Sequence, residues 1–469
     1  MVTALKRLAG VKAFRMSLMG FSAILVGSAM VQGVAWAQAD PTGAATLEAN
    51  PNAPVNFVWT LVAAFLVFFM QAGFALLEAG SVRQKSVANV LTKNVVDFLM
   101  CGMAFWAFGF AIMFGGSALS SGLEDGNDIF GSSGFFLAGD AYDVTTMEIW
   151  FFQMVFAATA ATIVSGTMAE RTKINAYMAY SFLISAIIYP VFGHWAWGGG
   201  WLATMDTPFR DFAGSAVVHT VGGTAALVGG LMVGPRIGKF GPDGKPRPIS
   251  GHNVTFIVLG MLILFLGWFG FNPGSTLAAT DLRISVIAVN TFLAGIASGL
   301  VVYYIRFIQT GKVDIVATCS GIIGGLVAIT APCAFVEPWA AVVIGLIAGP
   351  IVVYGAALLE NVAKLDDPVW AVPCHMFCGL WGVLAVGVFA DGTYLEVSGL
   401  IDGNSSQIVS QVIGMVAVVA WTGIASAIVF SLIKLSMGLR IPEADELAGV
   451  DASEHTSTAY PADEAMATG

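Results

Sequence analysis

The feature that most constrains this chain is the recurrence of apolar runs of 18 or more residues along almost its whole length. A helix of about 20 apolar residues crosses the hydrocarbon core of a bilayer and satisfies its own backbone hydrogen bonds there. Charged residues make up only 11% of the 469 residues, against about 25% in soluble domains. The sequence therefore predicts an all-α polytopic membrane protein. No basic patch is available for nucleic acid.

Eleven transmembrane helices are expected within a membrane domain over residues 55–436. They are Val55–Leu77, Val95–Gly115, Met147–Met168, Ile174–Phe192, Ala213–Val233, Val254–Asn272, Ile284–Phe307, Ile315–Ala331, Pro338–Leu359, Val369–Ala390 and Val409–Leu435. If residue 38 lies outside, the outer loops contain only two basic residues, Arg210 and Arg283, and the other loops and the tail contain the rest. The positive-inside rule then places the N-terminus outside and the C-terminus inside.

The two ends of the chain differ from the membrane domain. Residues 1–37 have a basic start, an apolar stretch and Ala35-Trp36-Ala37, which is typical of a cleavable signal peptide; the alternative is an uncleaved first helix. Residues 38–54 are then an extracytoplasmic N-terminus. Residues 437–469 are polar and are expected to form a cytoplasmic tail, with a short surface helix near 440–449 and a loose end after it. The acidic loop near Glu124 and Asp125 is expected outside.

Two segments share the pattern Asp-x7-His, each opening an apolar run. They are Asp211–His219 and Asp367–His375, and a glycine follows each histidine by four residues, at Gly223 and Gly379. Ionisable residues within membrane segments are rare and usually functional. Matched frames in the fifth and tenth spans predict an inverted five-helix repeat with an extra C-terminal helix and a shared polar site between the halves.

His219 and His375 each lie about six residues, roughly 9 Å of helix, into their spans from opposite faces. If the rings meet, one nitrogen donates to the other and both imidazoles stay neutral. Separate packing histidines, a metal site with Cys374 and Cys378, and bis-histidine haem ligation are the alternatives, although no fourth zinc ligand is apparent. Of the other histidines, His194 is expected to hydrogen bond at an outer edge, and His252 and His455 to be solvated.

Aromatic residues gather near the outer ends of several spans. Trp197 adjoins three glycines that expose its ring face, and such a face attracts small cations by about 0.5–2 kcal/mol. Phe152 and Phe156 lie one turn apart, and Phe271 and Ser275 end the sixth span. The alternative for Trp197 is an interfacial belt, and Phe152, Phe156, Phe271 and Ser275, each taken alone, indicate core packing rather than a gate.

Several long motifs in order resemble the ammonium transporter family (Amt/Mep/Rh), specifically its Amt branch, over roughly residues 57–460. The motifs are Gly73-Phe-Ala-Leu-Leu-Glu-Ala-Gly80-Ser-Val-Arg83, Ala169-Glu-Arg171, Trp197-Gly-Gly-Gly200, Asp211-Phe-Ala-Gly214 through His219, Gly267-Trp-Phe-Gly-Phe-Asn272, His375 and Leu439-Arg-Ile-Pro442. Pro273 departs from the alanine that members often carry.

The resemblance implies a transporter that takes ammonium, deprotonates it and conducts ammonia through an apolar pore. It implies an outer recruitment site at Trp197 and Ser275, and a gate of Phe156 and Phe271 with Phe152 one turn away. It further implies that Asp211 supports the outer site without touching substrate, and that His219 and His375 are paired in the pore.

The resemblance also implies a homotrimer in the inner or plasma membrane, with a cytoplasmic face and tail that can bind PII-type signalling proteins. Ser453 stands where some relatives carry a regulatory phosphorylated threonine. Neither an enzymatic activity nor a metal or other cofactor is expected. Two alternatives remain, an ammonium sensor that signals through its tail and a haem protein that uses the two histidines.

Overall fold

The computed structural model describes residues 39–120, 123 and 126–460, and within these residues the chain is helical, with isolated β-bridges but no strand. The predicted signal peptide, Glu124, Asp125 and residues 461–469 lie outside the described residues. The main helices are α3 (Ala53–Ser81), α4 (Val87–Ala104), α5 (Phe110–Phe114), α6 (Val144–Met168), α7 (Ile174–Leu183), α8 (Tyr189–Ala196), α9 (Val221–Val233), α10 (Val254–Phe271), α11 (Ile284–Thr310), α12 (Ile315–Thr330), α13 (Pro338–Asn361), α14 (Cys378–Phe389) and α15 (Ser406–Ser436).

Short elements complete the framework. The π-helical turns are η2 (Phe105–Gly109), η5 (Ile184–Ile188), η6 (Ser215–Thr220) and η8 (Val372–Phe377). Each continues directly into an α-helix, so that α4 with α5, α7 with α8, η6 with α9 and η8 with α14 form single rods. The remaining short helices used below are the 3₁₀ turn η7 (Pro273–Thr276) and the terminal helices α2 (Ala44–Ala49), α16 (Glu443–Ala448) and α17 (Val450–Glu454).

A helix stands at each of the eleven predicted positions. Ten helical stretches in the described residues are long and apolar enough to cross a membrane, and the eighth position holds the shorter apolar helix α12 of 16 residues. The predicted all-α polytopic membrane fold is therefore confirmed. The count of eleven crossings, the orientation and the inverted repeat stay predictions.

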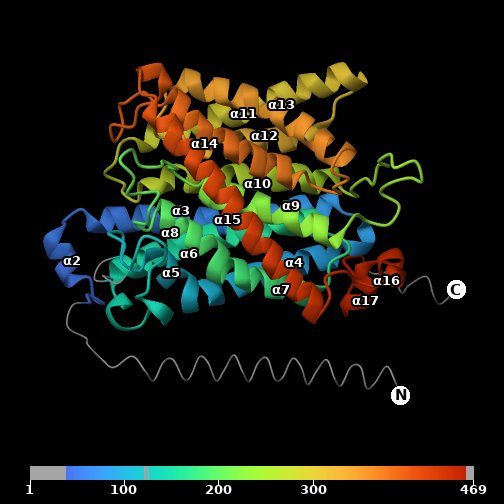
Figure 1. Ribbon diagram of the computed structural model, residues 1–469, viewed down its shortest axis with the longest axis horizontal. Coiled ribbons are helices and arrows are strands. Elements are labelled where there is room, and N and C mark those ends of the chain that lie inside the picture. The colour runs from blue at the N-terminus through green and yellow to red at the C-terminus, as the bar shows by residue number, and fades with distance from the viewer. Residues whose placement is uncertain (1–38, 121–122, 124–125, 461–469) are drawn as a thin grey trace.

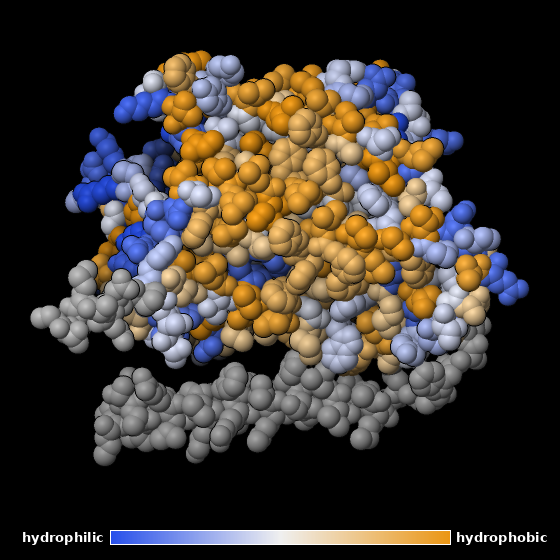
Figure 2. All heavy atoms as spheres, turned by 180° about the vertical axis from the view of Figure 1, so that it is seen from behind, coloured by the Kyte–Doolittle hydropathy of each residue, from blue (hydrophilic) through white to orange (hydrophobic). Residues whose placement is uncertain are grey.

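The outside of the bundle is apolar where lipid would lie. Figure 2 shows an apolar surface between two polar ends. Large hydrophobic residues are exposed on several helices, among them Phe65, Leu262, Leu300 and Val416. Because a monomeric soluble protein rarely exposes a continuous apolar surface of this kind, the surface is that of a membrane protein.

Inside the bundle, glycines let α3 and α10 pack in opposite directions at close range. A Cβ at Gly73 would lie 2.8 Å from Leu264, and one at Gly80 would lie 2.4 Å from the Asn253 carbonyl oxygen. On the facing helix, a Cβ at Gly260 would lie 2.5 Å from the Leu77 nitrogen. Small residues permit such contacts between helices in lipid.

The segment before α3 and the tail after α15 lie at opposite ends of the bundle (Figure 1). We call the end with α2 the outer end and the end with α16 and α17 the inner end. The sequence suggested a loose end after residue 449. The structure differs as far as Glu454, because α17 is fixed to α4. The Asp451 carboxylate accepts hydrogen bonds from the backbone N–H groups of Ala88 and Asn89, at 2.9 and 2.8 Å.

Candidate functional site

The first histidine segment begins with a carboxylate that caps the π-helical turn. Asp211 accepts hydrogen bonds of 2.8–3.0 Å from four consecutive backbone N–H groups, those of Gly214, Ser215, Ala216 and Val217. The start of a helix leaves such N–H groups without partners and favours negative charge. Burial raises the pKa of Asp211 to about 6, and the four N–H donors oppose that rise. This cap fixes the start of η6, which carries His219.

The second histidine segment repeats this arrangement. Asp367 accepts hydrogen bonds from the N–H groups of Ala371 and Val372, at 3.0 and 2.9 Å, and burial raises its pKa to about 6. The residue three positions after each aspartate has a positive φ, +116° at Gly214 and +57° at Trp370. The matched sequence frames therefore have matched local geometry.

The two histidine-bearing rods cross where the matched glycines lie. A Cβ at Gly223 would approach the Met376 nitrogen to 2.4 Å, and a Cβ at Gly379 would approach the Ser215 carbonyl oxygen to 2.5 Å. Each glycine therefore faces the π-helical turn of the other rod. This reciprocal contact brings residues 219 and 375 together.

His219 and His375 face each other through their Nδ1 atoms, which are 3.2 Å apart. Both residues are buried, and their ring centroids are 5.2 Å apart. One Nδ1 must carry a proton for the bond to form and the other must not, so the pair is neutral when one donates to the other. Within the described residues, His219 Nε2 has no hydrogen-bond partner.

Aromatic rings extend from the histidine pair toward the outer end. The Phe271 ring stacks on His219 with centroids 5.3 Å apart, and on Phe156 with centroids 4.0 Å apart. The Phe152 ring, on the same helix as Phe156, has its centroid 4.6 Å from the Phe156 ring centroid. The Trp197 and Phe156 rings lie edge to face, with centroids 6.4 Å apart. We call Trp197, Phe156, Phe271, His219 and His375 the ring file.

At the outer end of the file, Trp197 is half-buried and its indole N–H donates to the Asp211 carbonyl oxygen at 2.7 Å. Ser275 is also half-buried, and its hydroxyl donates to the Phe271 carbonyl oxygen at 2.7 Å. Because that proton is already engaged, the Ser275 oxygen offers lone pairs to a donor. An aromatic face and an acceptor oxygen suit a small cation with N–H groups.

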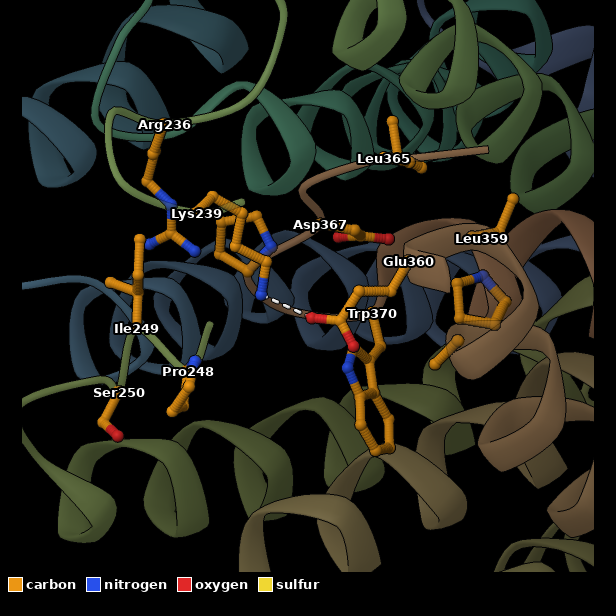
Figure 3. A pocket seen from close by; sticks show the side chains of 13 residues that line it. Arg236, Lys239, Pro248, Ile249, Ser250, Leu359, Glu360, Leu365, Asp367 and Trp370 are labelled. Atoms are coloured by element: carbon orange, nitrogen blue, oxygen red, sulfur yellow. Dashed lines mark hydrogen bonds and ion pairs between the residues drawn. The ribbon is translucent and has the colours of Figure 1, made fainter. Parts of the chain in front are cut away.

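Three cavities continue from the histidine pair toward the inner end. A small one of about 20 Å³ is lined by His375, Phe74, Glu78, Leu77 and Val369, among others. Leu77 and Val369 also line a larger cavity of about 360 Å³. That cavity shares further lining residues with a third of about 160 Å³, whose side chains appear in Figure 3.

The third cavity is polar and charged. Lys239 forms a 2.5 Å ion pair with Glu360 across it, and Asp367 and Trp370 lie nearby (Figure 3). The two cavities farther from the histidines, of about 360 and 160 Å³, are both larger than the one of about 20 Å³ beside His375. They give the ring file an aqueous side at its inner end.

A buried ion cluster lies beside these cavities. Arg236 binds Asp366 at 2.8 Å and Glu170 at 2.5 Å, and Arg171 donates to the Asp366 carbonyl oxygen at 2.9 Å. Burial alone would raise the pKa of Asp366, but hydrogen bonds from Arg236 and the charge of Arg171 hold it below its ordinary value. Burial alone would lower the pKa of Arg236, but the carboxylates of Asp366 and Glu170 raise it above its ordinary value.

The geometry does not favour the metal and haem alternatives. The two axial nitrogens on opposite sides of a haem iron stand about 4 Å apart, twice a usual metal–nitrogen bond of about 2 Å, whereas these stand 3.2 Å apart. Cys374 Sγ donates to the Ser320 carbonyl oxygen and Cys378 Sγ to that of Ala348. Among the described residues, no group of three or more His, Cys, Asp or Glu could hold a metal.

The other histidines have different surroundings. His194 is buried, with its nitrogens 2.8 Å from the Met113 carbonyl oxygen and 2.6 Å from that of Asn127. His252 and His455, which were expected to be solvated, are half-buried and hydrogen-bonded. His252 contacts the Val82 carbonyl and the Tyr460 hydroxyl, and His455 contacts the Asn89 amide.

Two residues at the file were not assigned a role from sequence. Trp268 stacks on His219 with ring centroids 5.3 Å apart, and the Phe74 ring centroid lies 6.4 Å from that of His375. Trp268 stands three residues before Phe271 and so shares its helix face. That spacing could have revealed it, but the position of Phe74 depends on how α3 packs.

Comparison with known proteins gives a consistent match. The model of the family described as "Ammonium Transporter Family" matches residues 58–460. The chain is 50% identical over 443 residues to "Ammonium transporter Amt2" of Archaeoglobus fulgidus, covering 91% of this chain and 93% of that protein. It is 37% identical to "Ammonium transporter 1 member 3" of Solanum lycopersicum, covering 88% and 95%.

Solved structures agree in fold. One called "Sensor Amt Protein" superposes with a TM-score of 0.79 at 35% identity, covering 86% of this chain and 99% of that one. The crystal structure of Candida albicans Mep2 gives a TM-score of 0.75 at 26% identity, covering 87% and 94%.

Proposed function

Because the chain belongs to the ammonium transporter family, we propose that it recruits ammonium at the outer end of the ring file, deprotonates it and conducts ammonia past the paired histidines. The observation that carries this mechanism is the unbroken sequence of ring contacts from Trp197 to His375. The protein is a multi-pass membrane transporter in this proposal, not an enzyme, and its membrane is the inner or plasma membrane.

Recruitment uses the Trp197 ring face and the Ser275 hydroxyl oxygen. The ring attracts a cation, and the oxygen accepts one of its N–H groups because the hydroxyl proton is already donated to Phe271. Asp211 holds Trp197 through its carbonyl oxygen and η6 through its carboxylate, so it positions the site without contacting substrate.

Conduction depends on loss of a proton. Phe156 and Phe271 are fully buried and stacked, so the file below the outer site is narrow and apolar. A bare cation there pays a large desolvation cost, whereas neutral ammonia does not. The histidine pair offers ammonia hydrogen bonds from neutral rings. Potassium carries the same charge but has no proton to lose, so it is excluded.

The first prediction tests the two histidines separately. Uptake of methylammonium into vesicles that contain the purified protein should fall about 10²-fold in His219→Ala and in His375→Ala, a typical effect of removing a positioned proton-transfer group. His252→Ala makes the same change away from the file and should transport normally. Unaltered rate and selectivity in both file variants would remove the role assigned to the pair.

An ammonium sensor is the second candidate. It is favoured by the similarity to the structure called "Sensor Amt Protein" and by the tail contacts with α4. A sensor would leave growth on limiting ammonium independent of this gene while a downstream response required it. Growth that requires the gene supports transport instead.

Assembly and regulation form a separate part of the proposal. The protein forms a homotrimer with one pore in each subunit, and a PII-type signalling protein binds its cytoplasmic face. Ser453 is exposed on α17, two residues after the aspartate that caps α4, so a phosphate there would add charge beside this contact. Mass measurement in detergent tests the trimer, and co-purification with a PII-type protein tests the partner.

A further inference from the structure

A second group of ionisable residues lies within the membrane domain, beside the ring file rather than in it. Glu78 is on α3, and Lys93 and Asp97 are on α4; all three are buried. Ionisable residues inside a bilayer are costly and usually functional. None of the roles proposed above uses them.

Hydrogen bonds hold both carboxylates. Ser165 and Asn94 donate to Oε2 of Glu78, the latter at 3.4 Å. Asp97 accepts from Gln71 at 3.3 Å and from the Tyr177 hydroxyl at 3.2 Å. These partners come from four helices, α3, α4, α6 and α7, so the cluster is part of the packed interior.

Lys93 is the one basic residue of this cluster, and Glu78 and Asp97 are its two acidic residues. Its Nζ lies 5.8 Å from the Tyr177 ring centroid and has no hydrogen-bond partner within the described residues. The charges of Glu78, Glu454, Glu170 and Arg171 act on it. With all three groups ionised, the two carboxylates and one ammonium leave one uncompensated negative charge. Because such a charge is costly in a buried site, the cluster is suited to hold one proton that it can exchange.

The cluster reaches the ring file through Glu78. Glu78 and His375 line the same 20 Å³ cavity, and a cavity of this size and polarity can hold one water. The Nδ1 of His375 faces His219, which leaves Nε2 for such a water. Ser165 and Asn94 both donate to Oε2 of Glu78, which leaves its Oε1 for this water. Leu77 and Val369 line both this cavity and the 360 Å³ cavity, so the two cavities adjoin.

Resting on the proposed function, we propose that Glu78 accepts the proton that ammonium gives up at the histidine pair and releases it toward the inner end. One N–H bond of ammonium breaks and the proton goes to the pair. His375 passes it through water to the Glu78 carboxylate, and ammonia continues as the neutral molecule. The Glu78 carboxyl then gives the proton to water in the 20 Å³ cavity that it lines, and the proton passes into the adjoining 360 Å³ cavity, so one proton and one ammonia cross together.

Lys93 and Asp97 act as positioning residues in this scheme. The positive charge of Lys93 favours the ionised Glu78 that is ready to accept. The negative charge of Asp97 disfavours two ionised carboxylates at once and so favours the protonated state. The two neighbours thus keep the two forms of Glu78 close in free energy.

The test uses vesicles that contain the purified full chain and records three quantities after an ammonium pulse: methylammonium uptake, electrical current and internal pH. Glu78→Gln keeps the shape and hydrogen bonds but cannot accept a proton as a carboxylate does. Its current should fall about 10²-fold, while ammonia entry continues and makes the vesicle interior more alkaline. Glu78→Asp should recover part of the current. Glu148→Gln, a change at another buried glutamate on α6, should match the unaltered protein.

Each other outcome decides a different question. If the unaltered protein gives neither uptake nor current, the proposed function fails and this proposal fails with it. If it gives uptake with internal alkalinisation and no current, the proton does not cross and only this proposal is overturned. The same follows if Glu78→Gln keeps a normal current, or if it loses uptake and current together, because Glu78 would then belong to the ammonia path or to the fold.

Discussion

At the scale of single residues, Asp211 connects the two parts of the outer half. Its carboxylate fixes the N-terminus of η6, and its carbonyl oxygen holds the Trp197 indole at 2.7 Å. A polar group in so buried a position is stable only when its partners are complete. The position of the outer tryptophan and that of His219 therefore depend on one side chain.

The second prediction compares two substitutions of Asp211. Asp211→Ala leaves four buried N–H groups without an acceptor and should lower the free energy of unfolding by at least about 2 kcal/mol, since each such group costs about 1–3 kcal/mol. Asp211→Asn keeps one acceptor oxygen and should be less harmful. Thermal unfolding in detergent at pH 7 measures both, with Asp206→Ala at an exposed aspartate as control. Equal stability of all four proteins would contradict the capping role.

At the scale of secondary structure, the decisive elements are the two π-helical turns and the helices that follow them. η6 continues as α9, and η8 as α14, and each rod presents a glycine to the other's turn. A π-helical turn widens the helix locally and is frequent at functional sites. Here two such turns place the imidazoles in contact.

The third prediction concerns this crossing. Gly223→Ala adds a Cβ 2.4 Å from the Met376 nitrogen, which is backbone and cannot turn aside. Overpacking of this kind costs about 1–3 kcal/mol, and moving the rods apart should also reduce methylammonium uptake. Gly423→Ala on α15 is the matched control, because its Cβ would meet only Thr224 at 3.9 Å. A variant at Gly223 with normal uptake and stability would show that the close crossing is not needed.

Much of the element order could be predicted from the sequence. Apolar length alone located a helix at each of the eleven positions, because a bilayer allows few other structures. The π-helical turns at Ser215–Thr220 and Val372–Phe377 could not be predicted, since they depend on how the two rods press together. The docking of α17 on α4 was also missed, because it links residues more than 360 positions apart.

At the scale of the whole molecule, the inner end is joined by buried ions. Arg236 connects the segment after α9 to Glu170 after α6 and to Asp366 before η8. Glu446 of α16 is buried and binds Arg440 at 2.7 Å, and it accepts the Ile237 N–H at 2.7 Å. The loops around the inner cavities and the tail thus form one connected structure.

The fourth prediction is a pH dependence of this structure. The pKa of Asp366 is lowered by folding, so its contribution to stability is complete above the unfolded value of about 3.9. It is lost progressively as the pH falls from there toward the folded value. Asp366→Asn breaks a buried ion pair and should cost about 3–5 kcal/mol at pH 7. The difference from the unaltered protein, followed by thermal unfolding, should shrink below about pH 4. A difference that grows in acid would contradict this assignment.

The candidate site was only partly predictable from the sequence. The Asp-x7-His frames indicated that His219 and His375 belong together, and the contact of 3.2 Å agrees with that interpretation. The order of Trp197, Phe156 and Phe271 came from family resemblance, because single aromatic residues have no distinctive spacing. The link from His375 to Glu78 had no sequence pattern, since a shared cavity depends on tertiary packing.

The account rests on the claim that the buried ring file admits only a substrate that can lose its charge. The fifth and most direct prediction compares ammonium with potassium in vesicles that contain the unaltered protein. Methylammonium or ammonium should enter rapidly, while potassium entry should not exceed that of protein-free vesicles, because potassium cannot shed its charge before the apolar file. Potassium entry at a rate similar to that of ammonium would contradict the account.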